Sequence, residues 1–588
     1  MPDTVFEVFE ATARAHADRP AMRHKHAGTW ETTTWAEYRS FVRQAARGLV
    51  ALGVVPGAGV AIMGFTRPEW YVANAAAMTV GGVPAGVYTT NTPEQCHYIA
   101  DHAEAMVAIV ENREYMERFL AVRDRLPRLR GIVLMEGEPA GDDVLSWAQL
   151  LERGSSVGEE EIDTRMAAAR PDDVCTLIYT SGTTGTPKAV MLTHRNIAWI
   201  TEKMVELLEV RVDDRLISYL PLSHIAEQIS SLYLSMATGA CVHFAESIDK
   251  LGDNMREVRP HVFLGVPRVW EKIQAGIQAA GAKNSSLKKK IAAWARRVGL
   301  AGGYADQRGQ SRPWAWPLAE RLVFSKVRAR LGLDATRLAG ASAAPLALET
   351  QEFFLSLGIP IMDLWGMSEL TGPGTISLPS SYRTGRSGRP IPGTEMRIGD
   401  DGELLVRGPH VFKGYFKNDA ATRETIDPEG WLHSGDVAEI GADGFVRITD
   451  RKKELIITAG GKNIAPQFLE GKLKQIPAIS QAVAIGDRRP YIVALLAVDP
   501  DRVVPEAEKA GSPARTPEAA AACPIFTACV ERQVEGINRG LARYETIKRI
   551  ALLPRELTTE AGELTPTMKL KRRVIHENHR DAIDALYS

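Results

Sequence analysis

Cysteine is scarce in this chain of 588 residues, and neither sign of charge predominates. The five cysteines are scattered without a CxxC pair, which is typical of reduced thiols and argues against a zinc site. Lys and Arg total 71 against 72 for Asp and Glu, which excludes a generally basic nucleic-acid-binding protein. No apolar run reaches the roughly 18 residues that a membrane-spanning helix needs. We therefore expect a globular protein with no spanning helix and no nucleic-acid partner.

The first twenty residues mix acidic and basic side chains among their apolar positions. This mixture is typical of neither a signal peptide nor a transit peptide. Together with the reduced cysteines, it predicts a cytoplasmic protein. Peripheral contact with the inner face of a membrane stays open at this point, because such contact needs no spanning segment.

Helical patterns alternate with short apolar segments from the N-terminus to about residue 380. Residues 60–63 and 106–110 are predicted strands, and residues 70–79 are a predicted helix. This alternation predicts an α/β fold with a largely parallel sheet. Beyond it follow short strands that suit antiparallel hairpins, separated by Gly/Asp turns, at 394–398, 403–407, 437–440 and 445–449.

A run of charged residues, 450–454, is followed by the glycine pair Gly460 and Gly461. A charged segment before a glycine pair is a plausible hinge between domains. The remaining residues, 450–588, have the size of a small domain. The sequence therefore predicts a domain boundary near Asp450.

Residues 179–188 form the strongest local feature, a stretch rich in Ser, Thr and Gly that ends in Lys188. Backbone N–H groups and hydroxyls of such a stretch converge on phosphate oxygens, and the lysine adds a positive charge. A Walker A loop is excluded, because Pro187 precedes the lysine and apolar strands flank both sides. A turn without function is the alternative on composition alone. The candidate phosphate-binding residues are Thr180, Ser181, Gly182, Thr183, Thr184, Gly185 and Lys188.

Seven segments occur in an order that resembles the adenylate-forming enzymes, which include acyl-CoA synthetases, firefly luciferase and the adenylation domains of peptide synthetases. These segments are residues 179–188, 218–224, 340–346, 365–369, 430–436, 450–453 and 564–572. The resemblance covers the chain from Tyr179 to the C-terminus. Within the superfamily, the bubblegum branch of long-chain fatty acyl-CoA synthetases is the most similar, on residues 263–272, 366–369 and 459–464.

The resemblance implies that a fatty acid and ATP first form acyl-AMP, which then passes its acyl group to coenzyme A. Both first reactants are anionic, so the site must supply cations and aimed N–H groups. The phosphate-binding loop, Lys188, Mg²⁺ and a second lysine meet that need. Glu369 is the expected carboxylate on Mg²⁺, with Thr180 or Thr184 adding a hydroxyl. A surface or salt-bridged acid is the alternative for Glu369.

The resemblance also implies the residues around the nucleotide. Trp365 stands where the family usually has Tyr, so a stacking ring is kept and a hydroxyl is lost. Asp436 would accept hydrogen bonds from both ribose hydroxyls, and Arg451 is the implied second ribose contact. A turn-capping aspartate and a solvated hinge charge are their alternatives. The implied adenine residues are Gly340, Ala341, Ser342, Asp363, Leu364, Trp365, Gly366, Met367 and Ser368.

The C-terminal segment supplies the second lysine. The match to the family's terminal motif implies that Lys569 bridges carboxylate and phosphate, a role that suits lysine as a flexible point charge, and Lys571 is the alternative. On charge alone, this basic run would be a solvated face. Asp450 resembles the hinge residue about which the C-terminal domain reorients. Gly460 and Gly461 are then expected beside the pantetheine of coenzyme A, where glycine leaves the backbone unobstructed; a simple turn is the alternative.

His224 follows an apolar strand and is expected to polarise the carboxylate or to gate the acyl tunnel. A core histidine is the alternative. Some long-chain members of the family carry a Trp gate four positions beyond this histidine, where this chain has Gln228. That gating mechanism is therefore not transferred to this protein.

Residues 283–330 hold twelve basic side chains against two acids, with three tryptophans among them. Basic residues interleaved with tryptophan suit an anionic membrane surface. A solvated helical insertion is the structural alternative, and single-stranded nucleic-acid binding is a third reading. The tryptophans are Trp294, Trp314 and Trp316.

We therefore predict a large N-terminal α/β domain with stacked sheets and a small β subdomain, residues 1–449. A small mobile α+β domain, residues 450–588, follows it. The predicted activity is ATP- and Mg²⁺-dependent ligation of a medium- to long-chain fatty acid to coenzyme A through acyl-AMP. An acyl-AMP ligase that loads a carrier protein is the first alternative, and a catalytically silent lipid-binding relative is the second.

Overall fold

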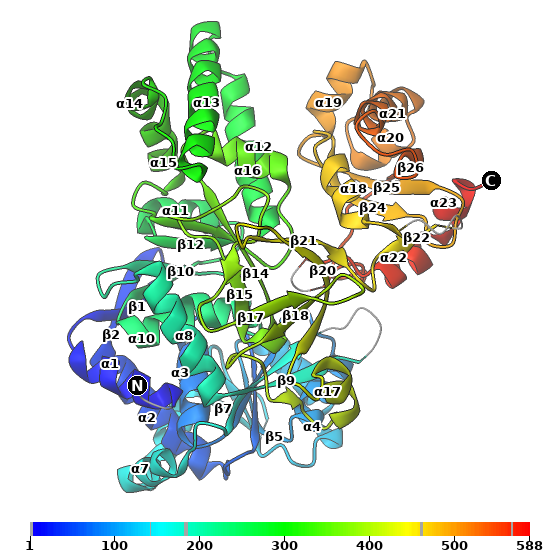
Figure 1. Ribbon diagram of the computed structural model, residues 1–588. Helices are drawn as coiled ribbons and strands as arrows, with labels where there is room; N and C mark the ends of the chain where they lie inside the picture. The colour runs from blue at the N-terminus through cyan, green and yellow to red at the C-terminus, as the bar shows by residue number, and fades with distance from the viewer. Residues whose placement is uncertain (1–3, 142, 181–185, 459–462, 566–567) are drawn as a thin grey trace.

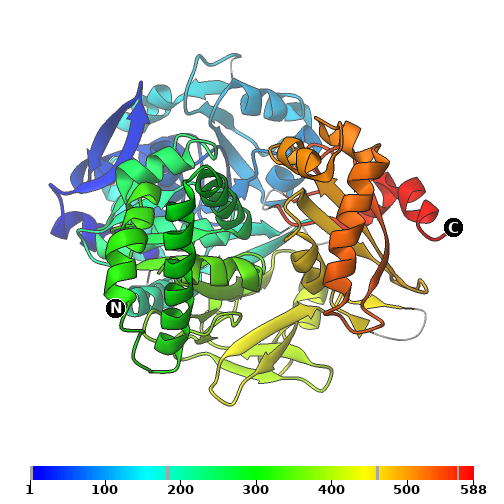
Figure 2. The ribbon, with the colours of Figure 1, turned by 90° about the horizontal axis from the view of Figure 1, so that it is seen from above.

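The computed structural model describes residues 4–141, 143–180, 186–458, 463–565 and 568–588. Within these residues, a large N-terminal part holds four sheets, and a small C-terminal domain with its own sheet lies beside it (Figures 1 and 2). The large part is built from alternating strands and helices, and the small domain combines a mixed sheet with helices. This is the predicted fold class.

The largest sheet has eight strands in the order β19-β9-β8-β4-β3-β5-β6-β7, and its centre is parallel. Strands β3 (Gly59–Met63) and β4 (Val83–Val87) are buried along their whole length, as expected where both faces of a parallel sheet are covered. The predicted strands 60–63 and 106–110 are confirmed. The other strands are β5 (Ala105–Val110), β6 (Gly131–Leu134), β7 (Val144–Ser146), β8 (Val174–Thr180), β9 (Lys188–Thr193) and β19 (Gly414–Tyr415).

Two further sheets complete the α/β part. The five-stranded sheet pairs its first three strands in parallel and adds two antiparallel strands. Its strands are β12 (Val262–Gly265), β13 (Leu338–Ala341), β14 (Ile361–Met367), β15 (Gly372–Ile376) and β16 (Arg389–Pro390). The four-stranded sheet consists of β10 (Arg215–Ser218), β11 (Cys241–Phe244), β1 (Pro20–His26) and β2 (Thr29–Thr34).

Helices pack around these sheets, and the predicted helix 70–79 lies within α3. Most are short, and several begin with a capping box, as Thr34 does for α2. The helices are α1 (Val5–Ala15), α2 (Trp35–Ala51), α3 (Pro68–Thr79), α4 (Pro93–His102), α5 (Arg113–Leu120), α6 (Trp147–Arg153), α7 (Glu159–Ala168), α8 (His194–Leu208), α9 (Ile225–Glu227), α10 (Leu234–Thr238), α11 (Leu251–Val258), α16 (Leu348–Leu355) and α17 (Asp419–Thr425).

The fourth sheet is the predicted antiparallel subdomain, in the order β17-β18-β20-β21. Two strands are longer than the sequence pattern indicates. Strand β20 begins at Leu432, because that residue pairs with Val406 of the neighbouring strand, so Asp436 lies in a strand and not in a turn. Strand β21 continues to Arg451, so the predicted boundary between residues 449 and 450 falls inside it. The bounds are β17 (Glu395–Ile398), β18 (Glu403–Arg407), β20 (Leu432–Ile440) and β21 (Val446–Arg451).

The C-terminal domain is organised around β25, which is buried throughout and pairs antiparallel with β24 and parallel with β26. The two-stranded pair β22–β23 follows the first domain directly. The elements are β22 (Ile456–Ile457), β23 (Asn463–Ile464), α18 (Pro466–Leu473), β24 (Ile479–Ile485), β25 (Ile492–Val498), α19 (Val503–Ala510), α20 (Pro517–Ala521), α21 (Pro524–Asn538), β26 (Ile547–Leu553), α22 (Arg572–Asn578) and α23 (Arg580–Ala585).

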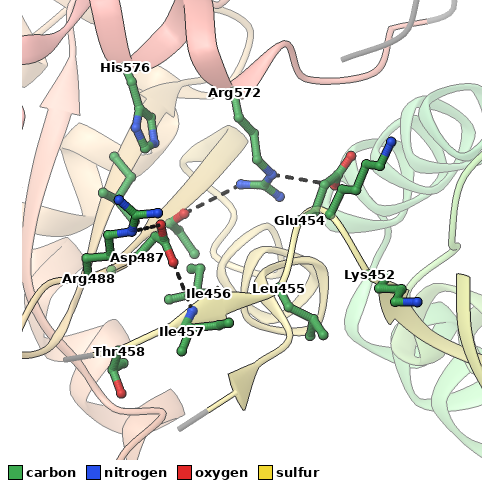
Figure 3. Close-up of a pocket in the computed structure, with 14 residues that line it drawn as sticks. Lys452, Glu454, Leu455, Ile456, Ile457, Thr458, Asp487, Arg488, Arg572 and His576 are labelled. Atoms are coloured by element: carbon green, nitrogen blue, oxygen red, sulfur yellow. Dashed lines mark hydrogen bonds and ion pairs between the residues drawn. The ribbon is translucent and has the colours of Figure 1, made fainter. Parts of the chain in front are cut away.

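A cavity of 560 Å³ lies in this domain, between residues 452–458, residues 484–488 and α22 (Figure 3). Arg572 of α22 forms ion pairs at its wall, with Nη1 2.8 Å from Glu470 Oε1 and Nε 3.5 Å from Glu454 Oε2. These pairs raise the pKa of the Arg572 guanidinium against the effect of burial. They join the helix that follows Lys569 to the segment just beyond Asp450.

Helix α12 (Pro267–Ala282) connects the two domains. Arg268 donates to the Ser480 carbonyl over 3.2 Å and lies 3.0 Å from Glu556 Oε1. One helical turn along, Glu271 Oε1 lies 2.7 Å from Lys474 Nζ. The first turns of α12 therefore hold the C-terminal domain in the position that Figure 1 shows.

The basic segment forms helices that extend beyond the sheets at the top of Figure 1. These are α13 (Ser286–Gln307), α14 (Trp316–Ala319) and α15 (Ser325–Leu331). Trp294 and Trp316 pack on a small cluster that contains Phe324, whereas Trp314 is 91% exposed. Only one of the three tryptophans is therefore free to contact a partner. Among the described residues, every helix is too short or too polar to cross a membrane.

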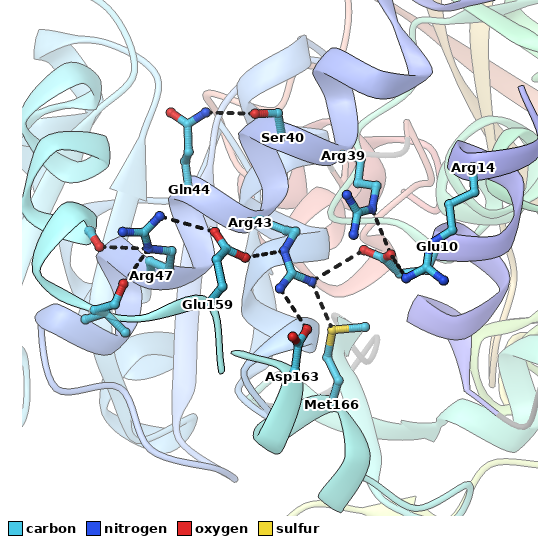
Figure 4. A network of polar contacts seen from close by, with 12 residues as sticks. Glu10, Arg14, Arg39, Ser40, Arg43, Gln44, Arg47, Glu159, Asp163 and Met166 are labelled. Atoms are coloured by element: carbon cyan, nitrogen blue, oxygen red, sulfur yellow. Dashed lines mark hydrogen bonds and ion pairs between the residues drawn. The ribbon is translucent and has the colours of Figure 1, made fainter. Parts of the chain in front are cut away.

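A buried arginine ties the N-terminal helices together (Figure 4). Arg43 of α2 places Nε 2.5 Å from Glu159 Oε2 and Nη2 2.7 Å from Asp163 Oδ1, both on α7. Arg39, also on α2, binds Glu10 of α1 at 2.8 Å. This network anchors α1 and α7 to α2.

Candidate active site

Asp436 is a buried carboxylate, 3% exposed, at the centre of the candidate site. It lies directly opposite Arg451 in the β20–β21 pair, and its Oδ1 is 3.0 Å from Arg451 Nε. The Trp365 indole N–H donates to Asp436 Oδ2 over 2.7 Å. Burial raises the pKa of Asp436, and the Arg451 charge opposes that rise. The structure thus brings together both predicted ribose residues and the predicted adenine-stacking ring.

Glu369 and Lys188 meet at a side chain that no sequence motif marked, Tyr415 of β19. The Tyr415 hydroxyl donates to Glu369 Oε1 over 2.7 Å, and Lys188 Nζ lies 4.6 Å from the centroid of the Tyr415 ring. Burial and the Glu369 carboxylate both raise the pKa of Tyr415, so its hydroxyl keeps its proton. The expected metal ligand and the expected phosphate-binding lysine therefore flank one tyrosine.

The two predicted adenine segments are neighbours, because the first ends β13 and the second runs along the adjacent strand β14. Position 366, at the bulge in β14, accepts only glycine, because a Cβ there would lie 2.0 Å from the Gly372 carbonyl oxygen. Burial raises the pKa of Asp363 to about 7. The bulge lies between Gly366 and Trp365, the residue whose indole N–H binds Asp436.

Lys569 enters this region from the C-terminal domain. Its backbone N–H donates to Thr565 Oγ1 over 3.0 Å, and its carbonyl accepts the Thr565 N–H over 2.8 Å. Burial and the charge of Arg451 lower the pKa of Lys569 to about 8, while Asp436 and Glu369 raise it. Residues far apart in the sequence therefore act on this one ammonium group.

Lys571, the alternative, occupies a different position. It precedes α22, and its backbone N–H donates to the Glu563 carbonyl over 2.8 Å. The pKa values of Asp436 and His224 both respond to the charge of Lys569. Of the two lysines, Lys569 is the one whose charge acts on these two predicted site residues.

His224 caps α9, and its Nδ1 accepts the N–H of Ala226 over 3.1 Å. Burial and the nearby charge of Lys569 lower its pKa to about 4. The imidazole is therefore neutral at pH 7, and because Nδ1 accepts, the proton resides on Nε2. The Nε2–H of His224 is therefore a hydrogen-bond donor that suits a substrate carboxylate.

Glu227 is a second residue that no motif marked, and it is 1% exposed. Ser231 Oγ donates to its Oε1 over 2.6 Å, and the Leu220 N–H donates to its Oε2 over 3.2 Å. Burial raises the pKa of Glu227 to about 7. Beside it, Gln228 is fully buried and donates to the Leu222 carbonyl over 2.8 Å. Both side chains tie the segment before His224 to the helix after it.

Asp450 is buried, and its Oδ1 accepts the N–H of Arg451 over 2.6 Å. Its Oδ2 has no hydrogen-bond partner among the described residues, and burial raises its pKa to about 7. In the predicted phosphate-binding segment, residues 179–188, the Thr180 hydroxyl donates to the Lys188 carbonyl over 3.4 Å. The remaining predicted loop and coenzyme A residues lie outside the described residues: Ser181, Gly182, Thr183, Thr184, Gly185, Gly460 and Gly461.

The residues around Glu369 fit a magnesium ion that is shared with phosphates. No group of three or more His, Cys, Asp or Glu side chains that could hold a metal occurs in the described parts of the chain. Mg²⁺ typically takes only one or two protein carboxylates and fills its other positions with phosphate and water oxygens. Tyr415 uses Oε1 of Glu369, and within the described residues Oε2 makes no hydrogen bond. Within the described residues, one Glu369 carboxylate oxygen is thus without a hydrogen bond.

Comparison with known proteins identifies the family. Residues 9–416 match the family described as AMP-binding enzyme, and residues 453–588 match the AMP-binding enzyme C-terminal domain. The chain belongs to the AMP-binding enzyme family. A relative from Xenopus laevis, long-chain-fatty-acid–CoA ligase ACSBG2, is 39% identical and covers 100% of this chain and 84% of its own length. The human ligase ACSBG1 is 36% identical over 100% of this chain and 86% of its own length.

Solved structures of AMP-binding enzymes share the fold. The adenylation domain of a carboxylate reductase from Mycobacterium chelonae has a TM-score of 0.79 at 22% identity, over 99% of this chain and 91% of that one. The anthranilate CoA ligase AuaEII in complex with anthranoyl-AMP has a TM-score of 0.76 at 19% identity, over 99% and 98%. The predicted superfamily and its bubblegum-type relatives are confirmed. The protein is an AMP-forming ligase of this family with an ATP-binding adenylation fold.

Proposed function

We propose that this AMP-binding enzyme joins a medium- to long-chain fatty acid to coenzyme A through acyl-AMP, releasing AMP and pyrophosphate. The fatty substrate is supported by full-length identity of 36–39% to long-chain-fatty-acid–CoA ligases. The observation that carries the chemistry is the position of Lys569, whose charge from the second domain acts on Asp436 and His224 of the first. A cation delivered to that place serves a reaction between two anions.

In the first half-reaction, a carboxylate oxygen attacks the α-phosphorus of ATP, and the bond from that phosphorus to pyrophosphate breaks. Lys569, protonated below its pKa of about 8, offsets the repulsion between the two substrates. His224 donates its Nε2–H to the carboxylate oxygen that does not attack. Lys188 binds the departing phosphates. Mg²⁺, held by Glu369 and Thr180, would neutralise phosphate charge.

The nucleotide is held by the central carboxylate and its neighbours. Asp436 accepts hydrogen bonds from the ribose hydroxyls. Arg451 and the Trp365 N–H hold the two carboxylate oxygens of Asp436 in place. The Trp365 ring, held through its N–H by Asp436, stacks on the adenine. The ends of β13 and β14 form the rest of the adenine site, with residues Gly340, Ala341, Ser342, Asp363, Leu364, Met367 and Ser368.

In the second half-reaction, the thiol sulfur attacks the acyl carbonyl, the carbon–oxygen bond to AMP breaks, and the thiol proton passes to solvent. We propose that residues 450–588 rotate about Asp450 between the two steps. The rotation withdraws Lys569 and brings Gly460 and Gly461 to the pantetheine. The end of β21 at Arg451, where the chain leaves the first domain, supports a hinge here, and within the described residues the buried Asp450 Oδ2 makes no hydrogen bond.

The test is pyrophosphate release with ATP and Mg²⁺ across carboxylic acids from acetate to very long chains, with and without coenzyme A. We expect turnover to peak at medium to long chains and to require coenzyme A. The absence of pyrophosphate release with every acid would contradict the proposed fatty-acid substrate. Adenylation that coenzyme A does not stimulate would instead favour an acyl-AMP ligase that loads a carrier protein. Fatty-acid binding without ATP or pyrophosphate release would favour a silent lipid-binding protein.

We also propose that α13 contacts an anionic membrane surface. Leu287, 67% exposed, lies near the N-terminus of this helix and is followed by three consecutive lysines, residues 288–290. Cations at a helix N-terminus oppose the helix dipole, so the helix itself does not account for them. An apolar side chain among cations at a projecting tip suits a negatively charged lipid surface.

A further inference from the structure

Tyr415 lies between two groups of opposite charge that the proposed reaction needs at the phosphates. Its hydroxyl binds Glu369 Oε1 at 2.7 Å, and its ring centroid lies 4.6 Å from Lys188 Nζ. The side chain is 5% exposed. One buried residue thus contacts both the expected metal ligand and the expected phosphate-binding lysine.

The surroundings of Tyr415 hold it firmly. In the β19–β9 pair it lies opposite Val190, so it is attached to the strand that Lys188 begins. Its N–H donates to Thr422 Oγ1 over 2.9 Å. The Phe412 ring packs edge-on against it at 4.9 Å, and the Phe412 N–H donates to the Glu369 carbonyl over 2.9 Å. The strand of Lys188 and the segment of Glu369 are therefore both fastened to the same short stretch of chain.

A lysine and a glutamate that contact the same buried side chain could instead pair with each other. In the part of the chain that the structure describes, neither Lys188 nor Glu369 forms an ion pair. A direct pair would neutralise the charge of Lys188 and occupy a carboxylate oxygen of Glu369. The face of an aromatic ring attracts an ammonium group without taking its N–H donors. A hydroxyl takes one carboxylate oxygen and leaves the other.

We propose that Tyr415 is a positioning residue. It keeps Lys188 and Glu369 from pairing with each other and orients both toward bound ATP and its metal. Its ring directs the Lys188 ammonium to the phosphates, and its hydroxyl turns Glu369 so that Oε2 faces Mg²⁺. This inference rests on the proposed function, because it assigns Lys188 and Glu369 to bound ATP and its metal. It adds a residue that touches neither substrate but determines how two others meet them.

Two substitutions separate the two contacts of Tyr415. Tyr415→Phe keeps the ring and removes the hydroxyl, so the Mg²⁺ concentration for half-maximal ATP binding rises roughly tenfold, the effect of losing one hydrogen bond to a charged group. ATP binding in EDTA stays unchanged. Tyr415→Leu removes the ring as well, so Lys188 pairs with Glu369 and ATP binding in EDTA also weakens. Titration calorimetry without fatty acid measures both constants in the absence of turnover.

A double variant tests whether Lys188 forms an ion pair with Glu369 when the Tyr415 ring is removed. Adding Glu369→Gln to Tyr415→Leu removes the carboxylate that captures the lysine. ATP binding in EDTA then returns toward the wild-type value, although the response to Mg²⁺ stays lost. A merely structural role for Tyr415 would give a double variant that binds no better than Tyr415→Leu.

Tyr98→Phe is the matched control. The Tyr98 hydroxyl donates to the Pro187 carbonyl over 2.9 Å, next to Lys188 but away from Glu369. This variant loses a tyrosine hydroxyl in the same neighbourhood and should keep the wild-type Mg²⁺ response. An unchanged Mg²⁺ response in folded Tyr415→Phe would overturn the inference. Failure of the wild-type protein to bind ATP with Mg²⁺ would instead overturn the proposed function.

Discussion

At the scale of single residues, Lys569 is the cation that the C-terminal domain brings to the site. Replacing it with alanine removes the charge that, in the proposed reaction, offsets repulsion between fatty carboxylate and ATP. We expect Lys569→Ala to slow acyl-AMP formation by roughly 100-fold or more, the cost of losing one electrostatic contact to a transition state. Conversion of supplied acyl-AMP to acyl-CoA should be retained. Pyrophosphate release and thioester formation measure the two steps separately.

Lys571→Ala is the control for this prediction. Lys571 belongs to the same basic run, but its described contact is a backbone hydrogen bond that the substitution keeps. Its adenylation rate should stay near that of the wild type. Slow adenylation in Lys571→Ala together with unimpaired Lys569→Ala would reverse the assignment of the two lysines.

The depressed pKa of Lys569 predicts a pH dependence. Burial and Arg451 lower that pKa from 10.5 to about 8, so the charged form is populated below pH 8 and lost above it. The kcat/KM for ATP, which reports the free enzyme, should therefore fall as the pH rises through about 8. Lys569→Arg keeps its charge to a higher pH and should move this fall upward. The same alkaline fall in both proteins would exclude Lys569 as its source.

At the scale of elements, the first turns of α12 hold the C-terminal domain in the position that delivers Lys569. The pair Glu271–Lys474, at 2.7 Å, is partly buried on both sides, so reversing one charge replaces attraction by repulsion. We expect Glu271→Lys to slow the adenylation half-reaction several-fold, by an energy on the order of 1 kcal/mol. Thioester formation from supplied acyl-AMP should be spared, because it follows the proposed rotation.

Reversing both charges tests whether the pair itself is responsible. Glu271→Lys combined with Lys474→Glu restores an attractive pair in the opposite sense. The adenylation rate should then recover, whereas Lys474→Glu alone should resemble Glu271→Lys. No recovery in the double variant would mean that α12 acts through its other contacts, such as Arg268 with Glu556.

Element-level predictions from the sequence were good where the pattern is local. The apolar segment 60–63 has a buried strand's composition, and it forms β3. Residues 432–436 contain Ser, Gly and Asp, which disfavour strands, and yet they open β20 because Val406 pairs with Leu432. Their conformation depends on a partner strand and not on their own propensity. The extent of β21 through Arg451 has the same cause, since Arg451 pairs with Asp436.

At the scale of the whole molecule, the projecting tip of α13 predicts binding to anionic vesicles. Each cation near such a surface contributes about 1 kcal/mol, so replacing the lysines at 288, 289 and 290 with glutamine should weaken binding roughly 100-fold. Vesicle sedimentation with phosphatidylserine measures it, and neutral phosphatidylcholine vesicles are the control. Equal binding to both vesicle types would remove the membrane surface as the partner. Adenylation of a water-soluble acid should be unaffected, because this tip lies away from the site.

The sequence by itself determined the family and most of the architecture of this protein. The Ser/Thr/Gly stretch before Lys188, the ordered segments after it and the alternation of helices and strands all depend on neighbours along the chain. These local patterns predicted the α/β fold and the antiparallel subdomain, whereas the residues Glu369, Asp436, Arg451 and Lys569 came from the resemblance to the adenylate-forming enzymes. Local patterns carry this information because propensity, periodicity and motif spacing are properties of short segments.

Only the tertiary structure decided how these groups meet. Tyr415 and Glu227 had no signal in the sequence, because their partners lie on other segments and each became significant only when burial forced its polar atoms to find partners. The effect of the Lys569 charge on Asp436 likewise depends on how the folded C-terminal domain packs against the first domain. Burial and the position of distant charges set pKa values and hydrogen-bond partners, and these are properties of the packed molecule, not of any segment.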